Sequence, residues 1–475
     1  MLNLKIKDIV NFLDAEIGDI PSENLNCSIT GVSVNSKKVQ KGDLFVALKG
    51  QKTDGHKYIR EAFYNGAVAF LCEKDFDFEE DFFKLKKVSV IKVSNTLKSL
   101  QKIGFSIREK FRGKVVGITG SCGKTTTKEF VASVLKESFS VFKNKGNSNG
   151  QIGVPVTLFG LDNTYDLSVI EMGISDFNEM DILANIVKPD IAIITNIGHS
   201  HLEYLKTLEN VFKEKFKITN NFSKDNVLFL NGDDPFLFSV ESFGAPFKIL
   251  TFGLDSANLD FKAFNIKNTS EGIIFDILYQ EKVYKEFKIN AVGKHILKDA
   301  LAAICVGFYF NITENKIKSA LLKLETCSGR QNIKEMEILS RNSQKVEVTF
   351  IDDSYNASPE SMKAAIDILA SYKKDKRKIA ILTDMLEQGK NSKVMHEKIG
   401  ELLAKNDIDI LMTIGEHSKF TGEKFKRINE NAIFFHFRSI DEIYTALKNI
   451  VENNDVILVK GSRRFHLENL LKKFP

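Results

Sequence analysis

The chain has 475 residues, a length that at roughly 150 residues per domain indicates about three domains. Apolar residues make up 43% and charged residues 27% of it, which is the composition of a folded globular protein and excludes global disorder. Lys and Arg number 67 against 62 Asp and Glu, a net charge of +5 without a long block of one sign, so no nucleic-acid partner is indicated.

Neither a membrane helix nor a secretion signal is indicated. The longest apolar run, residues 300–310, is shorter than the ~20 residues of a membrane span. Charged residues interrupt residues 1–20, so these lack the apolar core of a signal peptide. The five cysteines form no C-x-x-C pair, which fits neither a zinc ribbon nor a disulfide framework. We expect a cytoplasmic monomer.

The first part of the chain mixes short β-type runs with one amphipathic helix. Apolar runs at 43–48 and 67–71 have strand character, and apolar residues recur at helical spacing over 95–111. We predict a small α/β domain over residues 1–112.

From residue 113 the pattern changes to apolar strands that alternate with helical stretches. The predicted strands are 115–119, 167–171, 191–195 and 227–230. Such alternation favours a parallel sheet covered by helices. Three alternating stretches between 259 and 290 predict an antiparallel edge on the same sheet, and helices follow at 294–310 and 314–324. We predict a central domain over residues 113–328.

A second alternating series fills residues 329–475. Its predicted strands are 346–351, 379–382, 410–414, 432–435 and 456–459. The series is typical of an open, Rossmann-like sheet with crossover helices. The basic cluster at 373–378 is interpreted as a solvated helix end.

The strongest chemical signal follows the strand at 115–119. The chain continues as Gly120-Ser121-Cys122-Gly123-Lys124-Thr125-Thr126 and then as an amphipathic helix. Glycines let backbone N–H groups wrap phosphates, and the helix N-terminus adds partial positive charge. In such a loop the lysine reaches the β- and γ-phosphates and the first threonine offers its hydroxyl to Mg²⁺. The loop predicts an ATP site, although Ile118 stands where the strict pattern has glycine.

Polar residues also end two further strands. Glu171 lies at the expected carboxyl edge of the sheet, where ligands bind, as either a Mg²⁺ ligand or a solvated carboxylate. His199 and His201 follow the strand at 191–195, and their spacing alone does not say which binds a ligand.

Together these patterns resemble the Mur ligase family, the ATP-dependent amide-forming enzymes of peptidoglycan precursor synthesis. The resembling segments are 120–126, Asn147-Ser148-Asn149, Glu171-Met172-Gly173, 196–203, 352–359 and Lys460-Gly461-Ser462-Arg463. They span all three predicted domains. The resemblance implies an α/β protein with an N-terminal UDP-binding domain, a central P-loop domain and a C-terminal Rossmann-like ligase domain.

The resemblance also implies roles for individual residues. It assigns catalysis to Lys124, Glu171, His201, Lys215 and Arg330, and Mg²⁺ binding to Thr125, Glu171, His201 and a carbamylated Lys215, with Lys213 and Lys217 as competing registers. It assigns ATP binding to Gly120, Ser121, Cys122, Gly123, Lys124, Thr125, Thr126, Asn231, His295, Asp299, Arg330 and Asp353. It assigns substrate binding to Ser36, Lys37, Asn147, Asn149, Tyr355, Asn356 and Lys460.

The activity implied by the resemblance is addition of D-alanyl-D-alanine to UDP-N-acetylmuramoyl-tripeptide through an acyl phosphate. The nearest alternative is a family member that adds one diamino acid to the UDP-muramoyl-dipeptide, but its Asp-Asn-Pro-Arg acceptor motif is missing from the sequence. A folylpolyglutamate-synthase-like enzyme leaves the first ~110 residues unassigned. A nucleotide-binding switch that ligates nothing is the alternative from another class.

Overall fold

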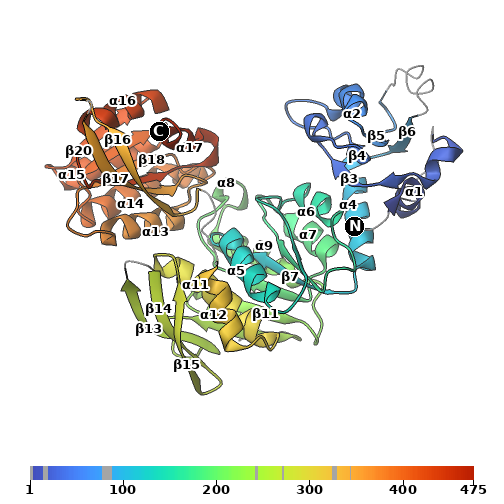
Figure 1. Cartoon of the computed structure of the whole chain (residues 1–475), viewed down its shortest axis with the longest axis horizontal. Helices are drawn as coiled ribbons and strands as arrows, with labels where there is room; N and C mark the ends of the chain where they lie inside the picture. The colour runs from blue at the N-terminus through green and yellow to red at the C-terminus, as the bar shows by residue number, and fades with distance from the viewer. Residues whose placement is uncertain are drawn as a thin grey trace.

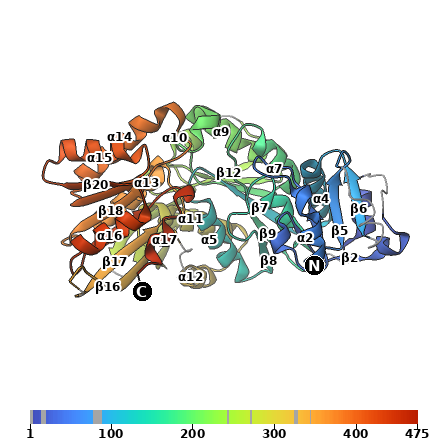
Figure 2. The ribbon, with the colours of Figure 1, turned by 90° about the horizontal axis from the view of Figure 1, so that it is seen from above.

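The computed structural model describes residues 4–13, 20–76, 88–240, 244–269, 272–323, 329–342 and 344–474. These form three α/β units, each built around its own sheet, which lie in a row with the central unit in the middle (Figures 1 and 2). The predicted α/β fold class is confirmed. The domain boundaries at 112 and 328 stay predictions, and residue 328 lies outside the described residues.

The N-terminal unit holds four parallel strands in the order β3-β4-β5-β6. They are β3 (Gly31–Ser33), β4 (Asp43–Val46), β5 (Ala69–Glu73) and β6 (Ser89–Val93), accompanied by β1 (Leu4–Lys5), β2 (Ser28–Ile29), α1 (Ile6–Leu13) and α2 (Ile59–Tyr64). The predicted helix is α4 (Thr96–Lys110), which begins where the Asn95 side chain accepts a hydrogen bond from the backbone N–H of Lys98 at 2.8 Å.

The central sheet has nine strands in the described residues, in the order β15-β14-β13-β12-β11-β10-β7-β9-β8. They are β7 (Lys114–Thr119), β8 (Val141–Lys143), β9 (Leu167–Glu171), β10 (Ile191–Ile194), β11 (Val227–Asn231), β12 (Lys248–Gly253), β13 (Phe261–Thr269), β14 (Gly272–Tyr279) and β15 (Lys282–Ile289). All pairs from β8 to β13 are parallel, and β14 and β15 pair antiparallel, which confirms the predicted edge.

Helices cover both faces of the central sheet. They are α5 (Lys124–Lys136), α6 (Gly153–Leu158), α7 (Glu179–Val187), α8 (Leu202–Leu205), α9 (Leu208–Phe216), α10 (Pro235–Phe238), α11 (Lys294–Tyr309) and α12 (Glu314–Leu322). Val116 and Ile118 point to the face packed by α5, α11 and α12. The opposite face, with Val115, shares one hydrophobic cluster with α4, α6, α7 and the N-terminal sheet. Among the described helices, none is long and apolar enough to cross a membrane.

The C-terminal sheet has the order β16-β17-β21-β18-β19-β20, with β16 antiparallel and the other pairs parallel. Its strands are β16 (Asn332–Leu339), β17 (Lys345–Asp353), β18 (Lys378–Thr383), β19 (Ile410–Ile414), β20 (Ile433–Phe437) and β21 (Val456–Lys460), and its helices are α13 (Pro359–Ser371), α14 (Ser392–Lys405), α15 (Ser418–Ile428), α16 (Ile440–Ile450) and α17 (Glu468–Leu471). The basic cluster at 373–378 divides in two. Lys373, Lys374 and Lys376 are exposed just after the end of α13, as predicted, whereas Lys378 is buried in β18 and Arg377 pairs with Asp455 at 2.7 Å.

One carboxylate closes the start of α15. Asp384, directly after β18, accepts hydrogen bonds from the backbone N–H groups of Glu416, His417 and Ser418 at 3.0, 3.0 and 2.6 Å. Gly415 permits this approach, because a Cβ there would lie 2.3 Å from Asp384 Oδ1. The helix N-terminus is therefore already occupied by an anion of the protein itself.

Candidate active site

The glycine-rich loop between β7 and α5 has the conformation that a phosphate site requires. Gly120 and Gly123 have φ angles of 150° and 80°, and a Cβ on Gly120 would lie 1.9 Å from Thr195 Oγ1. Lys124, the first residue of α5, folds back so that its Nζ donates to the carbonyl oxygens of Gly120 and Ser121 at 2.7 and 3.2 Å. The loop therefore offers the backbone N–H groups at the start of α5 and the half-buried Lys124, while the N–H groups of Ser121 and Cys122 donate to the carbonyl and side-chain oxygens of Asn196.

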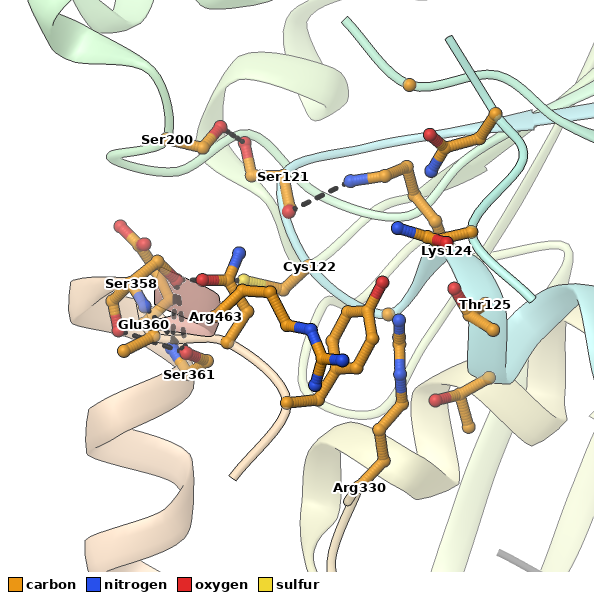
Figure 3. A pocket seen from close by; sticks show the side chains of 18 of the residues that line it. Ser121, Cys122, Lys124, Thr125, Ser200, Arg330, Ser358, Glu360, Ser361 and Arg463 are labelled. Carbon is orange, nitrogen blue, oxygen red and sulfur yellow. Dashed lines mark hydrogen bonds between the residues drawn. The ribbon is translucent and has the colours of Figure 1, made fainter. Parts of the chain in front are cut away.

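A cavity of about 1010 Å³ connects this loop to the C-terminal unit (Figure 3). It brings together most of the predicted site residues. Those that line it are Ser121, Cys122, Gly123, Lys124, Thr125, Thr126, Asn147, Asn149, Glu171, His201, His295, Asp299, Arg330, Asp353, Tyr355, Asn356 and Lys460. Gly120, Asn231, Lys215, Ser36 and Lys37 are not in contact with the cavity.

Oxygen ligands gather around Glu171 at the end of β9. Its carboxylate is 1% exposed, accepts a hydrogen bond from Thr125 Oγ1 at 2.7 Å and another from Asn149 Nδ2 at 2.6 Å. The described residues contain no group of three or more His, Cys, Asp or Glu that could hold a metal alone. A hard cation here therefore needs phosphate oxygens in addition to the hydroxyl and the carboxylate.

The two histidines have different partners, both from the C-terminal unit. His201 Nδ1 lies 2.5 Å from Glu387 Oε2, which leaves Nε2 available to a ligand. His199 Nδ1 lies 2.6 Å from Glu360 Oε1. His201 lines the cavity, and His199 does not.

Of the three candidate lysines on and after α9, only Lys215 is buried. Its side chain is buried beneath the site, and burial followed by the charge of Lys124 holds its pKa well below the usual value. Lys213 is exposed and pairs with Glu209, while Lys217 pairs with Asp181. Of the three lysines, Lys215 is therefore the one whose surroundings favour the neutral amine over the charged ammonium.

The first two turns of α11 supply two titratable groups, the half-buried His295 and the buried Asp299. Burial lowers the pKa of His295 to about 4, and His295 hydrogen-bonds Gln331. Burial raises the pKa of Asp299 to about 8, although Thr127 Oγ1 donates to its Oδ1 at 3.0 Å. Asn231 instead donates to the Thr195 carbonyl at 3.0 Å below the cavity.

The C-terminal side of the cavity carries stacked and paired charges. The guanidinium of Arg330 lies 4.2 Å from the ring centroid of Tyr355, and that of Arg463 lies 5.7 Å from the same centroid. Lys460 Nζ bonds Asp353 Oδ2 at 2.5 Å and the Asn356 carbonyl at 3.0 Å. Lys460 is thus held by the protein, whereas Arg330 faces the phosphate loop.

The N-terminal residues lie apart from this cavity. Ser36 Oγ donates to Glu61 Oε2 at 2.5 Å, and Lys37 is exposed next to it. Their assignment to the UDP end of a substrate stays a prediction.

The sequence reasoning missed Lys128, one turn after Lys124 on α5. Lys128 is completely buried, donates to the carbonyl oxygens of Asn144 and Gly146 at 3.0 and 3.1 Å, and lies 3.6 Å from Glu171 Oε2. The available signal was a lysine on the buried side of an amphipathic helix. It ties the loop that carries Asn147 and Asn149 to the carboxylate.

The fold and the cavity define a P-loop nucleotide-binding enzyme in which a second α/β unit meets the phosphate site. Family models match three segments: the Mur ligase family, catalytic domain at 28–104, the Mur ligase middle domain at 118–307, and the Mur ligase, glutamate ligase domain at 336–463. The chain belongs to the Mur ligase family.

Similar proteins cover nearly the whole chain. The UDP-N-acetylmuramoyl-tripeptide--D-alanyl-D-alanine ligase of Bacillus subtilis is 32% identical over 99% of this chain and 98% of its own length. The crystal structure of MurF from Acinetobacter baumannii has a TM-score of 0.84 at 25% identity, covering 99% of this chain and 98% of that one. MurF from Thermotoga maritima, in complex with ADP, has a TM-score of 0.78 at 28% identity, covering 94% and 96%.

Proposed function

We propose that this chain is an ATP-dependent ligase that adds D-alanyl-D-alanine to UDP-N-acetylmuramoyl-tripeptide in peptidoglycan precursor synthesis. The observation that carries the proposal is the cavity that joins the phosphate loop, Glu171 and the C-terminal unit. The full-length similarity to ligases of that name supports the choice of substrates. We expect the enzyme to act as a cytoplasmic monomer.

The chemistry follows from the poor leaving ability of hydroxide. ATP first converts the terminal carboxylate of the tripeptide into an acyl phosphate, and the amine of the dipeptide then displaces phosphate. The products are ADP, phosphate and the amide. Lys124 and Arg330, which both face the cavity, offset the charge on the transferring phosphoryl group.

Thr125, Glu171 and His201 are proposed to hold Mg²⁺, which neutralises phosphate charge when bound. The donor set fits a hard cation, because the Thr125 hydroxyl and the Glu171 carboxylate already lie 2.7 Å apart. Glu387 fixes the His201 ring through Nδ1 and so directs Nε2 away from the carboxylate.

Lys215 is proposed to react with CO₂ and so to become a carbamate. A neutral amine is the reactive form, and burial keeps the pKa of Lys215 low. The same Lys124 charge that disfavours an ammonium at this position favours an anionic carbamate.

The substrates are proposed to approach from opposite sides of the cavity. The UDP end would lie at Ser36 and Lys37, with Asn147 and Asn149 along the peptide. The acceptor would lie against Tyr355, Asn356 and Lys460 of the C-terminal unit.

Phosphate release tests the proposal. With UDP-muramoyl-tripeptide, ATP and Mg²⁺, release should require D-alanyl-D-alanine and should not respond to lysine or diaminopimelate. Productive turnover of UDP-muramoyl-dipeptide with a diamino acid would replace the proposed substrates, and ATP hydrolysis independent of any UDP-peptide would favour a nucleotide-binding switch.

A further inference from the structure

Of the described residues that line the cavity, three have a buried oxygen that accepts no hydrogen bond from a described residue. One is Gln331 Oε1, whose amide contacts His295. The other two, which share a neighbour, are Glu360 Oε2, in the first turn of α13, and Gln388 Oε1, in the loop after β18. Gln388 is only 3% exposed, and both residues line the cavity. Buried acceptors without partners are costly, so each oxygen is suited to accept a hydrogen bond from a group that enters the cavity.

Both side chains are held in place by the same residue of the central unit. Glu360 Oε1 accepts hydrogen bonds from the backbone N–H of His199 at 2.7 Å and from its Nδ1 at 2.6 Å. Gln388 Nε2 donates to the His199 carbonyl at 3.1 Å. Gly198 lets the carboxylate approach, because a Cβ there would lie 2.6 Å from Glu360 Cδ. The free oxygens are therefore pre-oriented.

The carboxylate lies close to the phosphate loop. Ser358, two residues before Glu360, has its Oγ 3.2 Å from the Sγ of Cys122 (Figure 3). After burial, the charge of Glu360 is the largest cause of the raised pKa of the Cys122 thiol. A triphosphate bound in the loop brings further negative charge to this carboxylate, which favours a cation at its free oxygen.

We propose that Glu360 Oε2 and Gln388 Oε1 bind the primary ammonium group of the incoming amine substrate. This inference rests on the proposed function and names a subsite within it. Both oxygens only accept hydrogen bonds, and an ammonium offers three donors and a positive charge.

The surrounding wall fits a zwitterion. Arg463 and Arg464 line the same cavity and supply positive charge for the carboxylate at the other end of a dipeptide. An ammonium suits these two acceptors because it can donate a hydrogen bond to each of them and carries a positive charge next to the carboxylate.

The test uses the full-length protein and compares Glu360→Gln with Asp367→Asn, which removes a charge from an exposed position of the same helix. Glu360→Gln is expected to raise the KM for D-alanyl-D-alanine roughly 10- to 100-fold, because a charge-assisted hydrogen bond is lost. The KM values for ATP and UDP-peptide should stay nearly unchanged. Asp367→Asn should leave all three unchanged.

Hydroxylamine supplies a second readout that bypasses the subsite. It is largely uncharged at neutral pH and traps an acyl phosphate as a hydroxamate without an ammonium site. Hydroxamate formation from ATP and UDP-peptide should be the same in the wild type and in Glu360→Gln. A parallel loss of hydroxamate and ligation, or a joint rise of all three KM values, would overturn the proposal, since Glu360 would then act only by joining the two units through His199.

If Glu360→Gln does not fold, Gln388→Leu tests the same subsite. It should raise the KM for the dipeptide by a smaller factor and leave hydroxamate formation unchanged. An unchanged KM for the dipeptide in a folded Glu360→Gln protein refutes the subsite alone. A wild-type protein that forms neither hydroxamate nor dipeptide-dependent phosphate refutes the proposed function instead.

Discussion

The central unit is joined to its two neighbours in physically different ways. Toward the N-terminal unit one hydrophobic cluster continues across the joint, and Arg108 of α4 donates to the carbonyl oxygens of Val187 and Lys188 at 2.7 and 2.9 Å. Toward the C-terminal unit the contacts at the site are mainly polar, as in the pairs of His201 with Glu387 and His199 with Glu360, and Val292 adds an apolar contact with the C-terminal core. Apolar joints resist opening, whereas exchangeable polar pairs let a unit move when substrates compete for them.

We expect the largest loss of activity from a substitution in the phosphate loop of the central unit. Lys124→Ala should lower the rate of ligation by about 10³-fold or more, because the charge that faces the phosphates is lost. Lys136→Ala, at the exposed end of the same helix, is the matched control. Near-normal turnover of Lys124→Ala with an unchanged melting temperature would place the nucleotide elsewhere.

Lys215→Ala should also lose most of its activity, and a short carboxylic acid in the assay should restore part of it. The acid would supply the carboxylate that the proposed carbamate provides. Lys213→Ala, on the exposed face of α9, should keep wild-type activity. If rescue occurs with Lys213→Ala and not with Lys215→Ala, the register of the modified lysine is wrong.

Glu387→Gln tests the polar joint directly. It weakens the hydrogen bond that orients His201, and partners of metal ligands typically contribute about 10- to 100-fold to metal affinity or activity. We expect a higher Mg²⁺ concentration for half-maximal activity, measured by Mg²⁺ titration at saturating substrates. An unchanged titration would mean that the contact is only a surface pair.

The raised pKa of Asp299, a residue that lines the cavity at the phosphate loop, should make the stability of the fold depend on pH. Its pKa is about 8 in the folded protein and 3.8 as the ordinary value, so between these values the folded state keeps a proton that the unfolded state loses. Stability should therefore fall as pH rises from about 4 to about 8, by up to ~1.4 kcal/mol per pH unit from this group. Melting curves of Asp299→Asn and wild type should diverge with rising pH in favour of the variant.

The apolar contact between the N-terminal and central units should be sensitive to an increase in side-chain volume. A Cβ at Gly104 of α4 would lie 3.0 Å from Pro155 Cα, so Gly104→Val should cost about 1–3 kcal/mol of stability through overpacking. Lys98→Val, on the exposed face of the same helix, is the control in urea unfolding. Equal midpoints for the two variants would show that this joint is as loose as the polar one.

The sequence predicted those helices, strands and loops whose formation depends on residues close together in the chain. The helix α4 follows from the spacing of Leu100, Ile103 and Ile107, all of which are buried, and the phosphate loop follows from its glycines. The strand β16 was missed because Lys334, Glu335 and Glu337 interrupt its apolar residues at a sheet edge.

Contacts between distant segments left no local pattern. Glu360 meets a histidine 161 positions earlier, and Glu387 meets one 186 positions earlier. Lys378 and Arg377 look like solvated charges until Arg377 meets Asp455, 78 positions later. Spacing within a segment carries no information on such partners, which depend on how the units pack.

The Asp384 carboxylate at the start of α15 has a consequence for how the enzyme handles nucleotides. Open sheets of this kind ordinarily offer a cofactor site where a helix begins after a strand. Here an internal side chain occupies those N–H groups, with three hydrogen bonds between 2.6 and 3.0 Å. The C-terminal sheet thus keeps the shape of a dinucleotide fold while the N–H groups at the start of α15 are occupied by Asp384, and other residues of this unit form one wall of the cavity at the phosphate loop.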